Sequence, residues 1–139
     1  MATNNWSNGP NLSTERYDHG CFSIKDSNIT TQIVVMGGHG SGPYSYLSST
    51  EILDVNSMTW RTGPALPISV SGNSGVRSEV RPYLGFSTGG YGNGQQQRKV
   101  YGLKKTNRNS LKWEEVHGMT TGRSWHSVVN VPKSLVPNC

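Results

Sequence analysis

A glycine pair and a tryptophan recur at nearly constant spacing along these 139 residues, and this repeat constrains the fold more than any other feature. Gly89-Gly90 follows Gly37-Gly38 by 52 residues. Trp113 follows Trp60 by 53 residues, and Trp60 follows Trp6 by 54. Self-similarity at a fixed period of about 50 residues is typical of proteins that stack copies of one supersecondary unit. We therefore expect several copies of a single unit, each too small to bury its apolar face alone.

The residues of one period predict four short strands. A first strand over 21–24 precedes an apolar strand over 31–36 that ends at the glycine pair. After a Gly/Ser/Tyr loop, strands over 50–55 and 58–61 are joined by a turn at Asn56-Ser57. Charged residues make up 15% of the chain, against about a quarter in typical domains, and 17 residues are glycine. Because no segment shows a sustained helical period, this composition predicts an all-β fold.

The same landmarks divide the chain into one complete unit, one less regular unit and two partial ones. Trp6 and Gly9-Pro10 match Trp60 and Gly63-Pro64 at an offset of 54 residues. The segment that starts at Arg123 matches the segment that starts at Arg16 at an offset of 107 residues, about two periods. We predict the last strand of a partial unit in residues 1–12, a complete unit in 13–68, a second, degenerate unit in 69–118, and the first strand of a further unit in 119–139.

This unit resembles the repeat of the kelch family, whose copies form the blades of a β-propeller. The matching residues are Arg16, Gly37, Gly38, Glu51 through Asp54, Trp60, Gly63 and Pro64 in the first unit, Gly89, Gly90, Val100, Tyr101 and Trp113 in the second, and Arg123 in the third. The second unit departs from the pattern at Val70 and Gly102. The resemblance implies an incomplete kelch-type propeller, with two near-complete four-stranded blades and a partial blade at each end. It also implies that the late tryptophan of each unit fills the space between neighbouring blades.

Kelch propellers usually close into a ring of about six blades, so the resemblance implies that closure requires further blades or the self-association of several copies. An open array leaves its end sheets exposed, and repeat arrays need polar end caps to stay soluble. The sequence shows no such cap. We therefore expect a fragment, a truncated product or one part of an assembly.

The segments that look like catalytic or metal sites lack the required spacing. Gly38-His39-Gly40-Ser41-Gly42 lacks both the third glycine of a dinucleotide fingerprint and the lysine of a phosphate loop. The four histidines have no close metal-ligand spacing, and Cys21, in an expected strand, is predicted to be a buried free thiol. We expect no enzyme activity, no cofactor and no metal. The alternative is an enzyme on a propeller scaffold, such as an oxidase, which metal analysis of the purified chain would test.

Recognition is the expected function, because loops on a rigid scaffold carry many binding residues. The loops between second and third strands, and those that enter each first strand, should share one face of a propeller. The kelch resemblance implies that this face binds a protein or peptide, as in a substrate adaptor of a ubiquitin ligase or a cytoskeletal binder. The candidate partner-binding residues, of types that dominate recognition surfaces, are Arg16, Tyr17, His39, Ser41, Tyr44, Tyr46, Ser71, Asn73, Tyr91, Asn93, Gln95, Arg123 and Trp125. The alternative for Arg16 and Arg123 is that they only brace neighbouring blades.

The net charge of +5 is unevenly placed, with six cations and no acid from Arg98 to Lys112. A solvated edge strand explains such a cluster, because charges discourage edge-to-edge pairing. The alternative is binding of an acidic partner or nucleic acid through 98–112, but Tyr101 alone is interleaved there, so we do not expect nucleic acid. The longest apolar run, Ile33 to Met36, is too short to span a membrane, and the polar N-terminus lacks a signal-peptide core. We expect no membrane contact and a cytoplasmic location.

Overall fold

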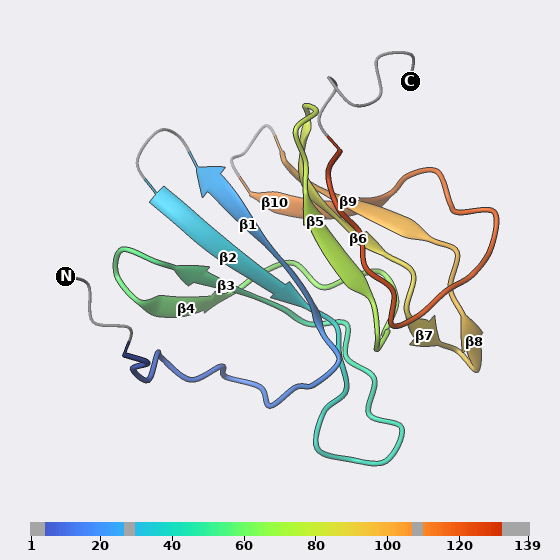
Figure 1. The fold of residues 1–139 in the computed structure, drawn as a ribbon, viewed down its shortest axis with the longest axis horizontal. Coiled ribbons are helices and arrows are strands. Elements are labelled where there is room, and N and C mark those ends of the chain that lie inside the picture. Colours follow the sequence, from blue (N-terminus) through green and yellow to red (C-terminus); the bar gives the residue numbers. More distant parts are fainter. Residues whose placement is uncertain (1–4, 27–29, 107–109, 132–139) are drawn as a thin grey trace.

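The computed structural model describes residues 5–26, 30–106 and 110–131, which form strands, turns and loops. Within these residues there is no helix long and apolar enough to cross a membrane. Two four-stranded antiparallel sheets follow one another along the chain (Figure 1). The first sheet contains, in order, β1 (Gly20–Asp26), β2 (Thr30–Met36), β3 (Thr50–Asp54) and β4 (Thr59–Thr62). The second contains β5 (Ser74–Arg77), β6 (Tyr83–Thr88), β9 (Val100–Lys105) and β10 (Leu111–Glu115). The prediction of an all-β fold is confirmed.

The burial of the first sheet follows its sequence pattern. The apolar run of β2 is buried on both faces, with Val34, Val35 and Met36 all in the core. In β1, Phe22 and Ile24 are buried, whereas the alternating residues Cys21, Ser23 and Lys25 are exposed, because successive side chains of a strand point to opposite faces. Cys21 takes the exposed face, so the prediction of a buried thiol is wrong.

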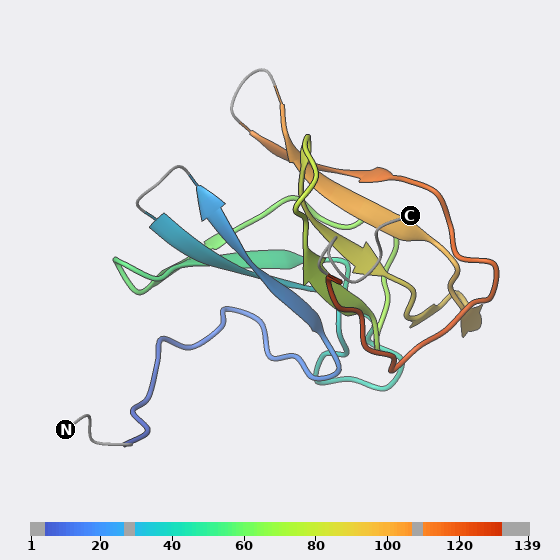
Figure 2. The same cartoon turned by 45° about the horizontal axis from the view of Figure 1, so that its top comes forward.

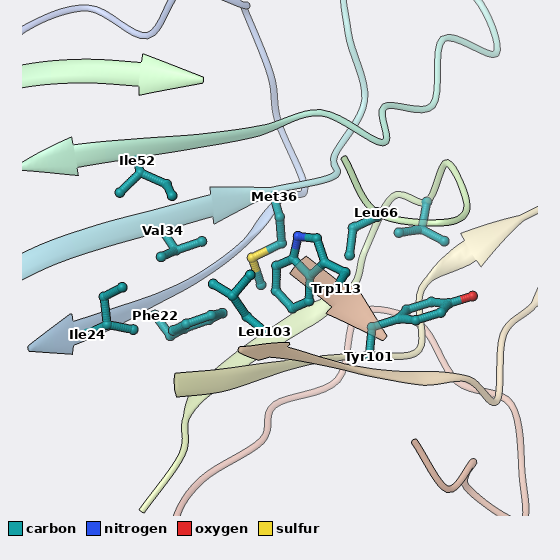
Figure 3. Packing of buried hydrophobic residues seen from close by; sticks show 10 residues of the cluster. Phe22, Ile24, Val34, Met36, Ile52, Leu66, Tyr101, Leu103 and Trp113 are labelled. Carbon is teal, nitrogen blue, oxygen red and sulfur yellow. The ribbon is translucent and has the colours of Figure 1, made fainter. Parts of the chain in front are cut away.

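The hydrophobic core lies between the two sheets (Figure 3). Its members come from both sheets and from the linker between them, and they are Phe22, Ile24, Val34, Met36, Ile52, Leu66, Val70, Tyr101, Leu103 and Trp113. The indole of Trp113 lies in the middle of this cluster and meets the ring of Phe22 edge-on, with the ring centroids 6.2 Å apart. Edge-to-face geometry is the favoured arrangement of aromatic pairs, so this contact helps to fix the two sheets against each other.

The two sheets approach most closely at their first strands, β1 and β5, and splay apart towards β4 and β10 (Figure 2). This approach requires glycine. A Cβ atom on Gly75 in β5 would lie 2.5 Å from the Cys21 carbonyl oxygen, and one on Gly85 in β6 would lie 2.2 Å from the Phe22 ring. Any larger residue would therefore push the sheets apart.

Two tryptophans make the same hydrogen bond one period apart. Trp113 Nε1 donates to the carbonyl oxygen of Pro64 at 3.0 Å, and Trp60 Nε1 donates to that of Pro10 at 2.9 Å. Trp113 is 4% exposed and packs between the sheets, whereas Trp60 is half-buried and lies outside the main core cluster. The tryptophan wedged between the described sheets is therefore Trp113, and Trp60 meets the N-terminal segment instead.

The strands predicted near the two ends of the chain are not formed in the described residues 5–12 and 119–131. A strand needs a partner edge with free backbone groups, and neither described segment is paired as a strand. The C-terminal segment still docks on the second sheet, where Asn130 Nδ2 donates to the Arg77 carbonyl oxygen at 2.8 Å. The rest of 1–12 and 119–139 lies outside the described residues.

Sequence reasoning missed a small hairpin inside the loop predicted over 91–97. Strands β7 (Tyr91–Gly92) and β8 (Gln95–Gln96) pair across a turn at Asn93 and Gly94. Both turn residues have positive φ, 51° and 76°, which is the requirement of a type I′ turn and the reason that Asn-Gly favours it. The buried Gln97 side chain donates to the Gly92 carbonyl oxygen at 2.6 Å and closes the base of the hairpin.

Candidate functional site

Backbone bridges hold the predicted binding loops side by side at one end of the sheets. Tyr17 and His39 exchange two backbone hydrogen bonds of 3.0 and 2.8 Å. One period later, Ser71 and Tyr91 exchange bonds of 3.0 and 2.7 Å. In each repeat the loop that enters the first strand therefore lies against the loop that leaves the second, as the sequence predicted.

A second set of bonds joins the entering loops of successive repeats. The Gly72 amide donates to the Asp18 carbonyl oxygen at 2.7 Å, and the Trp125 amide donates to the Gly72 carbonyl oxygen at 2.7 Å. All three residues have positive φ, between 51° and 65°. Such a backbone is unusual for an aspartate and a true outlier for a bulky tryptophan, and held outliers cluster at functional sites. Sequence reasoning missed Asp18, although its alignment with Gly72 in the repeat was available as a signal.

The glycine pairs anchor these loops. The Gly38 amide donates to the Val70 carbonyl oxygen at 2.8 Å, and the Gly90 amide donates to that of Arg123 at 2.9 Å. Gly38 has φ of 97°, and a Cβ atom there would lie 2.8 Å from the Tyr17 carbonyl oxygen. Positive φ and close backbone approach each require glycine, so the pairs fix the position of the next repeat's loop.

Aromatic rings from three loops gather on this surface. The Tyr17 ring stacks on His39 at 4.8 Å, His39 meets Tyr46 edge-on at 5.4 Å, and Tyr46 meets Tyr91 at 5.9 Å. An open hollow of about 570 Å³ lies beside them, lined by Tyr17, His39, Gly40, Ser41, Gly42, Pro43, Tyr44 and Tyr46. We call the set Tyr17, His39, Ser41, Tyr44, Tyr46, Tyr91 and Trp125 the aromatic loop face. Trp125 does not line the hollow, but its loop is joined through Gly72 to Asp18, next to Tyr17.

Several of these rings are open to solvent. Tyr44 is 85% exposed, Trp125 is 66% exposed and Tyr17 is 56% exposed. Trp125 lies flat enough on the backbone that a Cβ atom on Gly72 would be 3.0 Å from its ring. Large exposed aromatics that are held in place by neighbouring backbone lose little conformational freedom on binding, which suits them to act as anchors for a partner.

Arg16 belongs to the interior rather than to this surface. Its side chain is 0% exposed. The guanidinium donates to the Gly37 and Ser49 carbonyl oxygens at 2.9 and 3.1 Å and pairs with Glu51 at 2.7 Å. Burial raises the pKa of Glu51, but bonds from the Ser13 amide, from Arg16 and from the Thr14 amide outweigh burial and hold that pKa below its usual value. Arg16 therefore braces the first repeat, which is the alternative that the sequence left open.

Ser71 and Asn73 are also buried, with 3% and 5% of their surface exposed. Asn73 Nδ2 donates to the Met36 carbonyl oxygen at 3.3 Å and to Ser87 Oγ at 3.0 Å, so it ties one sheet to the next. Their side chains cannot meet a partner in this structure, because a first-strand entry loop must also seal the inner edge of the preceding sheet. The remaining predicted residues, Asn93, Gln95 and Arg123, are exposed but do not line the aromatic hollow.

The histidines offer no acid–base pair in the described structure. His39 Nδ1 donates to the Gly40 carbonyl oxygen at 2.8 Å, since a carbonyl can only accept. His126 Nε2 bonds Thr88 Oγ1 at 2.8 Å, and burial, aided by Arg123, lowers the pKa of His126. Burial likewise lowers the pKa of His19, with a further contribution from Arg16. Among the described residues there is no group of three or more His, Cys, Asp or Glu side chains placed to hold a metal ion.

Acids on the neighbouring strand partly neutralise the basic stretch. Lys99 Nζ lies 2.7 Å from Glu115, and Lys104 Nζ lies 2.5 Å from Glu114. The Tyr83 hydroxyl also donates to Glu114 at 2.8 Å. These pairs reduce the positive field along β9 and β10, so the stretch has less capacity for a nucleic-acid backbone than its composition indicates.

The repeat unit that contains the first sheet is similar to a known family. Residues 27–67 match the family model of the kelch motif. The first sheet of the chain therefore contains a kelch motif. The matched region contains β2, β3 and β4 and extends to the linker that packs under Trp113. A search of curated proteins returned no match.

The second sheet lies outside the matched region, but it makes the same contacts one period later. Gly90 and Trp113 repeat the bonds of Gly38 and Trp60. Kelch motifs generally mediate protein–protein interaction, and the two antiparallel sheets are consistent with partial propeller blades.

Proposed function

We propose that this kelch-repeat chain is a non-catalytic interaction module that binds a protein or peptide through its aromatic loop face. The observation that carries the proposal is the exposure of Tyr17, Tyr44 and Trp125 on loops that backbone bonds hold rigid. Tyrosine and tryptophan are the residues most enriched among binding hot spots. Rigid loops lower the entropy cost of association, which favours affinity.

The finer roles rest on the kelch resemblance. We propose a substrate adaptor of a ubiquitin ligase or a cytoskeletal binder, in the cytoplasm, as the setting in which the face is used. We also propose that the repeats occupy 13–68 and 69–118, with partial blades in 1–12 and 119–139, and that further blades or further copies of the chain complete the ring. A monomeric mass by light scattering would exclude closure by copies.

The experiment is affinity capture from a cell lysate, with the wild-type chain compared with a loop-face variant. The variant Tyr17→Ala/Tyr44→Asn removes two exposed rings, and asparagine tolerates the φ of 60° at position 44. The matched control is Val129→Ala, which removes a 74% exposed apolar side chain that does not line the hollow beside the aromatic rings.

We expect the control to retain the captured proteins and the loop-face variant to lose them, with circular dichroism unchanged for both. If the loop-face variant captures the same proteins as the wild type at the same yield, the aromatic loop face is not the binding surface.

A further inference from the structure

A groove at the opposite end of the blades from the aromatic loop face has no role in the proposed function. Figure 1 shows the β5–β6 hairpin and the 38–48 loop at opposite ends of the molecule. Beside that hairpin, a hollow of about 620 Å³ extends to β1. A second hollow of about 400 Å³ lies between the first sheet and β9–β10. Ile24 and Lys105 line both, so the two hollows form one interblade groove.

Positive charge dominates the side chains of this interblade groove. Its lining contains five cations and one carboxylate, and these are Lys25, Arg61, Arg77, Arg81, Lys105 and Glu79. Glu79 is 66% exposed and meets Arg77 at 3.5 Å, which is a weak surface pair. Outside the lining, Asp54 faces Arg61, but its carboxylate already accepts from the Asn56 and Ser57 amides.

Apolar side chains form part of the floor of the interblade groove. Ile24 is 3% exposed, and Leu84 and Leu111 pack against the same core cluster. Pro64 and Pro82 complete the apolar lining. The lining is thus mixed, with apolar side chains beside several charged ones, so apolar contacts and ion pairs can both contribute to the binding of a ligand.

We propose that the interblade groove binds an acidic peptide segment that also carries apolar side chains. Carboxylates of the peptide meet Lys25 and Arg81 at one end and Arg61 at the other, and its apolar side chains lie over Leu84 and Leu111. Arginine suits this role because its planar guanidinium binds a carboxylate through two parallel bonds.

The apolar floor distinguishes this ligand from other polyanions. A free polyphosphate has no apolar groups that could pack against Leu84 or Leu111. Single-stranded nucleic acid gains affinity from exposed rings on which its bases stack, whereas the Tyr83 ring covers Gly102 and its hydroxyl is bonded to Glu114. A peptide is the polyanion that uses both the charges and the floor.

Fluorescence anisotropy with the full chain tests the proposal. The probe is a short labelled peptide of alternating glutamate and leucine, and the reversed-charge control peptide alternates lysine and leucine. The test variant is Lys25→Gln/Arg81→Gln, which removes two exposed cations from the groove. The matched control, Arg98→Gln/Lys112→Gln, removes two exposed cations that do not line it.

We expect the acidic peptide to bind, the lysine peptide not to bind, and the test variant to weaken binding about tenfold while the control leaves it unchanged. The loop-face variant Tyr17→Ala/Tyr44→Asn should keep full affinity for this peptide, which separates the groove from the proposed function. The proposal fails if the acidic peptide does not bind, or if both double variants bind it equally. Displacement of the peptide by tripolyphosphate or a single-stranded oligonucleotide at equal concentration also contradicts it, because either ligand would bind without the apolar floor.

Discussion

Replacement of Trp113 by alanine should separate the contribution of the interblade wedge from that of an ordinary surface tryptophan. Trp113 lies in the core between the sheets, and its Nε1 donates to Thr50 Oγ1 at 3.2 Å and to the Pro64 carbonyl oxygen at 3.0 Å. Trp60 makes the same kind of bond to Pro10 but is only half-buried. The two residues therefore form a matched pair that differs mainly in burial.

The magnitude follows from that burial. An indole buries about 200 Å², which at about 25 cal/mol per Å² gives an upper limit near 5 kcal/mol. Trp113→Ala also removes the edge contact with Phe22 and leaves the Pro64 carbonyl oxygen without its donor. We expect the free energy of unfolding to fall by about 4–5 kcal/mol, within the range for buried Trp→Ala changes. Trp60→Ala, with about half the buried area, should lower it by about 2 kcal/mol.

Urea denaturation followed by far-UV circular dichroism measures both changes without relying on tryptophan fluorescence. The linear extrapolation gives each free energy of unfolding, and an unchanged slope shows that the variants unfold from a native state of similar compactness. The reasoning is refuted if Trp113→Ala costs no more than Trp60→Ala, because the second sheet would then not pack against the first as described.

Two further substitutions test the brace and the close approach of the sheets. Glu51→Gln should destabilise the chain by about 3–5 kcal/mol, because it leaves the buried Arg16 charge unpaired. The folded-state pKa of Glu51 lies below its usual value of 4.5. The stabilisation from its carboxylate is therefore complete above about pH 4.5 and is lost as the pH falls through the lower folded-state pKa. Thermal melts across this range should show a smaller loss of stability with acid for Glu51→Gln than for the wild type. Gly75→Ala should cost about 1–3 kcal/mol in urea denaturation, because the new methyl group meets the backbone of Cys21.

Each of these has a control. Arg16→Met/Glu51→Leu removes both charges of the buried pair and should recover part of the stability lost in Glu51→Gln, although the Ser13 and Thr14 amides lose their acceptor. Gly9→Ala adds a methyl group where no atom lies within 4 Å, so its free energy of unfolding should stay unchanged. An equal cost for Gly75→Ala and Gly9→Ala would contradict the close approach of β1 and β5.

The strand pattern of this chain could be predicted because the repeat supplies two readings of every element. Gly37-Gly38 and Gly89-Gly90 mark the ends of β2 and β6 in both copies, and the turn residues between them fall at matching positions. The placement of the aromatic loops side by side was predictable for the same reason. In each repeat the entry loop precedes the first strand and the exit loop follows the second, so the order of the strands places both loops at the same end of the sheet.

Side-chain direction was not predictable from that order. Arg16 and Tyr17 are neighbours in one loop, yet the first is buried and the second is exposed. The decision depends on Glu51, which lies 35 residues further along the chain and supplies the charge that makes burial of Arg16 favourable. Burial of a tryptophan between the sheets likewise depends on which segment lies next to it in space. Trp113 packs against the first sheet, so Trp113 and not Trp60 fills the described interface.

The bonds between successive loops have a consequence for how such a chain can change in length. The Gly72 amide donates to the Asp18 carbonyl oxygen, and the Trp125 amide donates to the Gly72 carbonyl oxygen. Gly72 therefore bonds the loop before it through its amide and the loop after it through its carbonyl. A duplicated segment of one period contains its own copy of this loop. Its backbone amide can donate to the loop before it, and its carbonyl oxygen can accept from the loop after it. Gene duplication can therefore add a blade without inventing an interface.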